Sequence, residues 1–200
     1  MGFNRNFAMA NDGTIYFNGE DKLWKCDAKT HALTATKSSF GDSPGMRSST
    51  AETKAGEIYG VTHKTNELFR YRPAEDKLEL LGPNWLSGGY TTVCELSPDE
   101  RFVYYLPGAH GGAFKDGTPV VQYEIATGQR KALAFLAPAF EKEHGYVPAG
   151  TYGMKLSADG STLYVNFNGH PADGVRPANI KPIGFGLTAF AAIHIPADER

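Results

Sequence analysis

The sequence predicts an all-β fold of the β-propeller type, on the strength of its composition and of an internal repeat. Its 200 residues include 23 Gly, 12 Pro, 12 Phe and 10 Tyr, a composition typical of short strands joined by tight turns. A turn followed by an alternating strand that ends on tyrosine occurs four times, at 11–16, 55–59, 99–104 and 159–164. The first three of these tyrosines are 43 and 45 residues apart, close to the roughly 40–45 residues of one four-stranded blade. The last interval is 60 residues, which indicates the same unit with an insertion.

Each repeat contains further strands around this turn, so that four antiparallel blades are visible. First strands are expected at 7–10, 49–53, 91–96 and 152–156, and third strands at 22–27, 67–72, 119–125 and 188–195. Fourth strands are expected at 32–36, 77–81 and 131–136, which leaves the last blade incomplete. Because alternate side chains of a strand lie on the same face, each third strand places two side chains on one face at matching positions. These pairs are Trp24/Cys26, Phe69/Tyr71, Val121/Tyr123 and Ala191/Ile193. One propeller therefore covers residues 1–200, with blades at about 4–37, 47–82, 89–137 and 151–200, and we expect its strand aromatics to pack between blades.

Two segments carry a family resemblance. Residues 96–104 (LSPDERFVY) and 156–164 (LSADGSTLY) resemble the "LSPDGxxLYV" signature of bacterial YVTN-type and TolB-like propellers. Residues 124–128 (EIATG) are similar to the turn between the third and fourth strands of those blades. The resemblance implies the C-terminal part of a ring of seven or eight blades, and a periplasmic or secreted location. A closed four-bladed ring, or two copies associating into eight blades, are the alternatives.

Charge and hydropathy exclude several classes of partner. Twenty basic and 22 acidic side chains give a net charge of −2, which argues against nucleic acid or an anionic membrane as the main partner. No run approaches 18 apolar residues, so no membrane span is predicted, and residues 1–6 lack the pattern of a signal peptide. Cys26 and Cys94 match no disulfide framework or zinc motif, and we expect two buried free thiols.

The connections between strands are short on one side of each predicted blade and long on the other. Short turns close the first strand onto the second and the third onto the fourth, whereas the other connections are long: 38–47, 82–89, 107–118, 137–150 and 168–187. In a blade these long loops emerge on one face, beside the central channel, and long loops on a rigid scaffold commonly carry function. The candidate residues of this long-loop face are His63, Trp85, His110, Lys115, His144, Tyr146, His170 and Arg176.

Two functions fit this face. The first is a binding module that takes a small molecule, a carbohydrate or a protein there, with self-association through open blade edges as a further expectation. The alternative is a propeller-type enzyme, a lactonase or polysaccharide lyase, with a divalent metal (Ca, Mn or Zn) held by His110, His144 and His170. No local spacing of metal ligands supports the second function, and no nucleophile or phosphate-loop motif is present. We therefore favour the binding module.

Overall fold

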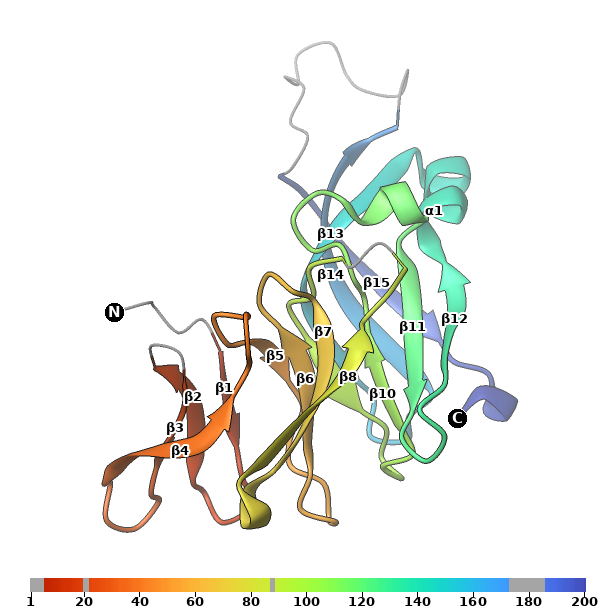
Figure 1. Ribbon diagram of the computed structural model, residues 1–200. Coiled ribbons are helices and arrows are strands. Elements are labelled where there is room, and N and C mark those ends of the chain that lie inside the picture. The colour runs from red at the N-terminus through yellow and green to blue at the C-terminus, as the bar shows by residue number, and fades with distance from the viewer. Residues whose placement is uncertain (1–5, 20–21, 87–88, 173–185) are drawn as a thin grey trace. The chain divides into compact units, whose positions relative to one another are not determined.

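The computed structural model describes residues 6–19, 22–86, 89–172 and 186–200 (Figure 1). By their internal contacts they form two compact units, Met1–Gly88 and Gly89–Arg200. Three sheets have four strands and one has three, all antiparallel between neighbours. We call them blades 1 to 4 in chain order.

The first unit holds blades 1 and 2, each with its strands in sequence order. Blade 1 consists of β1 (Phe7–Met9), β2 (Ile15–Gly19), β3 (Lys22–Cys26) and β4 (Leu33–Ser39). Blade 2 consists of β5 (Met46–Ser49), β6 (Ile58–Thr62), β7 (Glu67–Arg72) and β8 (Lys77–Pro83), with the 3-10 turn η1 (Pro73–Glu75) before β8. Their core is one cluster in which the Tyr16 ring meets the Tyr71 ring edge-on, with centroids 5.1 Å apart.

The second unit holds blades 3 and 4. Blade 3 consists of β9 (Cys94–Leu96), β10 (Phe102–Tyr105), β11 (Pro119–Glu124) and β12 (Arg130–Phe135), with η2 (Ala113–Asp116) between β10 and β11. The helix α1 (Leu136–His144) leads to blade 4, which consists of β13 (Tyr146–Leu156), β14 (Thr162–Pro171) and β15 (Leu187–His194), before η3 (Ala197–Glu199). A second core lies between these sheets and includes Tyr104, Leu106, Leu163, Val165 and Phe167, all fully buried. The incomplete last blade is thus confirmed for the described residues.

The predicted turns are closed by serine and aspartate side chains. Ser157 Oγ donates to Asp159 Oδ1 at 2.6 Å and accepts from the Thr162 N–H at 2.9 Å. Ser97 makes the same pair of bonds with Asp99, at 2.7 Å, and with the Phe102 N–H, at 2.9 Å. The two LSxD segments therefore share one local structure, in which the side chains satisfy backbone donors that the turn leaves free.

Several predicted boundaries are wrong. The strand expected at 49–53 is β5 at Met46–Ser49. The loop expected at 137–150 is instead α1 followed by the start of β13.

Both cysteines are free, but only Cys94 is buried, whereas Cys26 is half-buried. Tyr16, Tyr59 and Tyr104 are buried as expected, but Tyr164 is 40% exposed. None of the helices in the described residues is long and apolar enough to cross a membrane.

Candidate functional site

In the second unit, the connection between β10 and β11 is fixed by hydrogen bonds rather than left open. The Gly108 and Ala109 N–H groups both donate to the Tyr90 carbonyl, at 2.9 and 2.7 Å. Thr118 Oγ1 donates to the Pro148 carbonyl at 2.6 Å, which ties the end of the same loop to β13. The loop between β10 and β11 therefore has a defined position against blade 4.

The first residues of α1 are hydrogen-bonded to the end of this loop. The Leu136 and Ala137 N–H groups donate to the carbonyls of Thr118 and Gly117, at 3.1 and 2.9 Å. Residues 136–144 include Leu, Ala, Glu and Lys, all good helix formers. Gly145 ends the helix in the left-handed conformation, with φ of 60°, a position where glycine is strongly favoured. Figure 1 shows α1 at one end of the second unit and the chain terminus toward the other end.

A pocket of about 250 Å³ opens where these elements meet, and we call it the loop-face pocket. Its lining residues come from η2 and the residue after it, from α1, and from the ends of β13 and β14: Phe114, Gly117, Ala137, Pro138, Glu141, Val147 and His170. The walls are mostly apolar, with one carboxylate and one imidazole. The pocket is therefore built from the connections that the sequence singled out.

His170 is held in a defined orientation beside this pocket. Its ring meets the Phe114 ring edge-on, with centroids 5.6 Å apart. Its Nδ1 lies 2.9 Å from the Pro171 carbonyl oxygen, which can only accept, so Nδ1 carries the proton in this contact. The neutral imidazole then has Nε2 as a hydrogen-bond acceptor.

The other predicted residues of the second unit occupy separate positions. His110 is exposed, and its ring lies 4.5 Å from the Tyr90 ring. His144 is exposed at the C-terminal end of α1, with its ring 5.7 Å from the Phe140 ring. Lys115 is exposed on η2. Of the predicted residues in this unit that the structure describes, only His170 lines the loop-face pocket.

Tyr146 does not belong to the surface of this face, contrary to the sequence-based expectation. It is 9% exposed, and its hydroxyl donates to the Leu187 carbonyl at 2.9 Å. Burial raises the pKa of this phenol to about 12. Tyr146 therefore ties the start of β13 to the start of β15.

His63 and Trp85 belong to the first unit. The His63 N–H donates to the Gly45 carbonyl at 2.7 Å, and Ser43 Oγ donates to the His63 carbonyl at 2.6 Å. Trp85 is half-buried and follows Asn84, a buried residue whose N–H donates to the Asn66 carbonyl at 2.9 Å. Arg176 lies outside the described residues.

The three histidines of the metal hypothesis are not gathered into one site. Across the described ranges, no group of three or more His, Cys, Asp or Glu side chains is arranged to hold a metal ion. The rings of His110, His144 and His170 instead each contact a different aromatic residue. The metal hypothesis thus finds no support in the geometry of this part of the chain.

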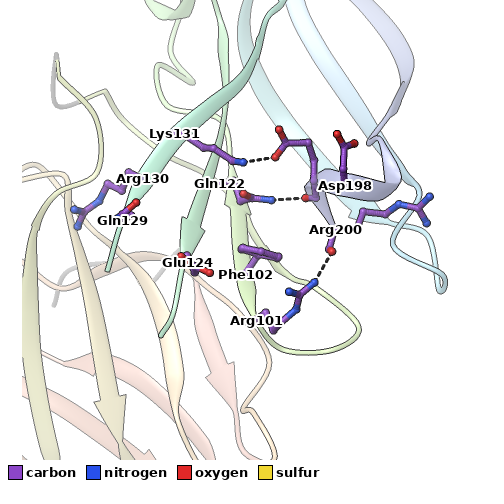
Figure 2. Close-up of a pocket in the computed structure, with 10 residues that line it drawn as sticks. Arg101, Phe102, Gln122, Glu124, Gln129, Arg130, Lys131, Asp198 and Arg200 are labelled. Carbon is purple, nitrogen blue, oxygen red and sulfur yellow. Dashed lines mark hydrogen bonds and ion pairs between the residues drawn. The ribbon is translucent and has the colours of Figure 1, made fainter. Parts of the chain in front are cut away.

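A second pocket, of about 320 Å³, is strongly polar (Figure 2). Gln122 Nε2 donates to the Glu199 carbonyl at 2.6 Å, and Lys131 pairs with the Glu199 carboxylate. Arg101 donates to the Arg200 carbonyl. These contacts hold η3 against blade 3, so much of the polar lining is already engaged within the chain.

Sequence reasoning missed most of the loop-face pocket. The apolar walls of the pocket are formed by Phe114, Pro138 and Val147. The sequence alone does not distinguish these residues from ordinary loop or core residues. An exposed phenylalanine between glycines and charged residues, as at 111–117, is the signal that points to Phe114, which is 38% exposed.

Comparison with known proteins gives no family model and no curated protein that matches the chain. Solved structures do match. TolB from Acinetobacter baumannii aligns with a TM-score of 0.60 and 15% identity, over 96% of this chain and 41% of that one. The tricorn protease aligns with a TM-score of 0.62 and 12% identity, over 98% and 16%. Regucalcin from Agrobacterium tumefaciens, a calcium-binding protein, aligns with a TM-score of 0.53 and 15% identity, over 82% and 52%.

The chain spans about half or less of the length of each of these proteins. At such identities the likeness concerns the fold. The repeat, the four antiparallel sheets in sequence order and these neighbours agree. The chain therefore has the β-propeller fold, in four consecutive blades.

Proposed function

We propose that this protein is a non-catalytic propeller module that binds a ligand or a protein through the long-loop face of its second unit. The loop-face pocket is the single observation that carries the proposal. Three connections of different kinds converge there, and hydrogen bonds from Thr118, Leu136 and Ala137 fix them in place. Concave, mostly apolar sites with a few polar groups are the usual form of a ligand-binding pocket.

The lining favours a ligand with an apolar body and a hydrogen-bond donor or positive charge. Phe114, Pro138 and Val147 offer apolar surface, and Glu141 offers a carboxylate. Because His170 Nδ1 is engaged with Pro171, its Nε2 adds a second acceptor in the neutral ring. Among the residues that the structure describes, no lysine or arginine lines the pocket. A ligand with an aromatic ring and a protonated alkylamine matches this combination.

The fold supports a binding role without deciding the ligand. Among the structural neighbours, regucalcin is described as a calcium-binding protein and tricorn as a protease, so similar blades serve different functions. The LSxD turns further support assignment to the YVTN-type and TolB-like branch of bacterial propellers, within a longer ring of seven or eight blades. An extracytoplasmic location is part of the same proposal.

Ligand-observed NMR with two matched probes tests the proposal. Phenethylamine and phenylacetate share an aromatic ring and differ in charge. We expect millimolar binding of phenethylamine, and about fivefold weaker binding of phenylacetate, since an exposed ion pair contributes roughly 0.2–1 kcal/mol. Phe114→Ala should weaken binding of both probes about tenfold. Glu141→Gln should remove the preference for the amine but retain the ring contact.

The matched control is Glu143→Gln, because Glu143 lies on α1 but does not line the pocket. Equal affinity for the two probes in the native chain, or unchanged binding in Phe114→Ala, contradicts the proposal. Stoichiometric Ca, Mn or Zn in the purified chain, lost on His110→Ala, would instead favour the enzyme hypothesis.

A further inference from the structure

Thr118, at the end of the loop between β10 and β11, has a backbone conformation that its side chain disfavours. Its φ is 53°, in the left-handed region, where a β-branched residue is a genuine outlier. Among the described residues, five others besides glycine have a positive φ: His31, Lys64, Asn66, Asp76 and Glu100. These five are exposed or half-buried and none is β-branched, whereas Thr118 is fully buried. Backbone strain of this kind persists only where the surrounding structure holds it in place, and it clusters at functional sites.

The threonine hydroxyl makes a contact that glycine, the residue best suited to this conformation, cannot make. Thr118 Oγ1 donates to the Pro148 carbonyl at 2.6 Å. Pro148 lies in β13 at a point where the register with β14 shifts, between Pro148 and Gly150. The hydroxyl therefore joins the loop before β11 to an irregular point of β13, and this hydrogen bond offsets part of the cost of the left-handed conformation.

The backbone of Thr118 holds two further walls of the loop-face pocket. Its N–H donates to the Ala113 carbonyl at 2.8 Å, at the start of η2. Its carbonyl accepts the Leu136 N–H at 3.1 Å, where α1 begins. Each partner of Thr118 is next in sequence to a residue that lines the pocket: Ala113 to Phe114, Leu136 to Ala137, and Pro148 to Val147. Three walls, from η2, α1 and β13, are thus joined at one buried residue that does not itself line the pocket.

We propose that Thr118 is the positioning residue of the loop-face pocket, and that its hydroxyl sets the affinity for the ligand without touching the ligand. This inference rests on the proposed binding function. Without the bond to Pro148, the walls that carry Phe114 and Val147 are no longer held together, and the ligand has to order them when it binds. A preorganised site binds more tightly because this ordering cost does not arise. The hydroxyl carries no charge, so its loss weakens binding of a cationic and an anionic probe by the same factor.

Ligand-observed NMR with phenethylamine and phenylacetate tests the hydroxyl through three substitutions. Thr118→Val keeps the β-branched shape but removes the hydroxyl, and should weaken binding of both probes about fivefold, the factor that corresponds to the net contribution of one hydrogen bond. Thr118→Ser, the conservative variant, keeps the hydroxyl and should bind both probes within about twofold of the native chain. Thr118→Gly also removes the hydroxyl but accepts the left-handed conformation, so it should show the same loss as the valine variant even if valine disturbs folding.

Thr92→Val is the matched control, because Thr92 Oγ1 also donates to a β13 carbonyl, that of Thr151, at 2.6 Å. Thr92 does not line the pocket, so its loss of a hydroxyl should leave both affinities within about twofold of the native values. Native affinity in both Thr118→Val and Thr118→Gly overturns the proposal, as does an equal loss in Thr118→Ser or in Thr92→Val. A native chain that binds neither probe contradicts the proposed function itself, and the positioning role of Thr118 fails with it.

Discussion

Close backbone approach at Gly150 fixes how blade 4 meets the loop that precedes blade 3's third strand. A Cβ atom at this position would lie 2.0 Å from the Ala109 carbonyl oxygen, a backbone atom that cannot move aside cheaply. Gly153, three residues further along β13, has only an ordinary contact, at 3.7 Å from Asn166 Nδ2. The two glycines therefore have different roles within one strand.

Gly150→Ala should destabilise the protein by about 2 kcal/mol or more, because the Ala109 segment has to shift to admit the methyl group. Gly153→Ala, the matched control, should change the free energy of unfolding by less than about 0.5 kcal/mol. Urea unfolding of both variants measures the difference. Equal stability of the two would show that the Ala109 segment adjusts freely.

Individual residues differed in how well the sequence predicted them. The serine and aspartate of the LSxD turns were identifiable because their hydrogen bonds are local, within five residues. Tyr146 and Phe114 were not, since the burial of one and the exposure of the other depend on α1 and on the ends of distant strands. Contacts between remote segments leave no pattern in a short stretch of sequence.

At the level of elements, the strand β5 shows why one boundary was wrong. Residues 49–53 read as a strand, but Thr50 Oγ1 accepts the Tyr59 N–H at 3.1 Å and donates to the Ala51 carbonyl at 2.7 Å. The Thr50 hydroxyl thus accepts the Tyr59 N–H, which a backbone carbonyl accepts in a regular antiparallel ladder. The strand therefore ends at Ser49. By contrast, β7 matches its predicted range of 67–72.

The outer strands of blade 2 carry a charged network. Glu79 pairs with Lys77 at 2.8 Å and with Arg70 at 2.6 Å, and Arg72 joins it at 3.2 Å. Hydrogen bonds from Lys77 and Arg70 lower the pKa of Glu79 from 4.5 to about 2. Because the pKa is lower in the folded state, the network stabilises the fold above pH 4.5, and this stabilisation is lost as the pH falls toward 2.

Thermal melting between pH 7 and pH 2.5 tests this network. The native chain should lose more stability on acidification than Glu79→Gln, since the amide cannot titrate. Glu75→Gln, on the neighbouring turn η1 and outside the network, should follow the native chain. The same acid sensitivity in Glu79→Gln and in the native chain would mean that other carboxylates dominate the acid response.

For the whole molecule, the period of the repeat was sufficient to predict the fold class. Spacings of 43 and 45 residues, with turn chemistry at each start, relate the three complete blades, and a longer spacing of 60 residues leads to a fourth blade with three described strands. The candidate face was placed from loop length, and the pocket does lie among those long connections. Its lining was not predictable, because α1 is an insertion into the repeat and has no counterpart in the other blades.

Binding at the loop-face pocket is the central claim, and protein-observed NMR with phenethylamine tests it most directly. We expect the largest shifts at Phe114, Ala137, Glu141 and Val147, with small changes at Gln122 and Lys131 of the polar pocket. Shifts concentrated at the polar pocket, with residues 113–117 and 136–144 unchanged, would contradict the claim.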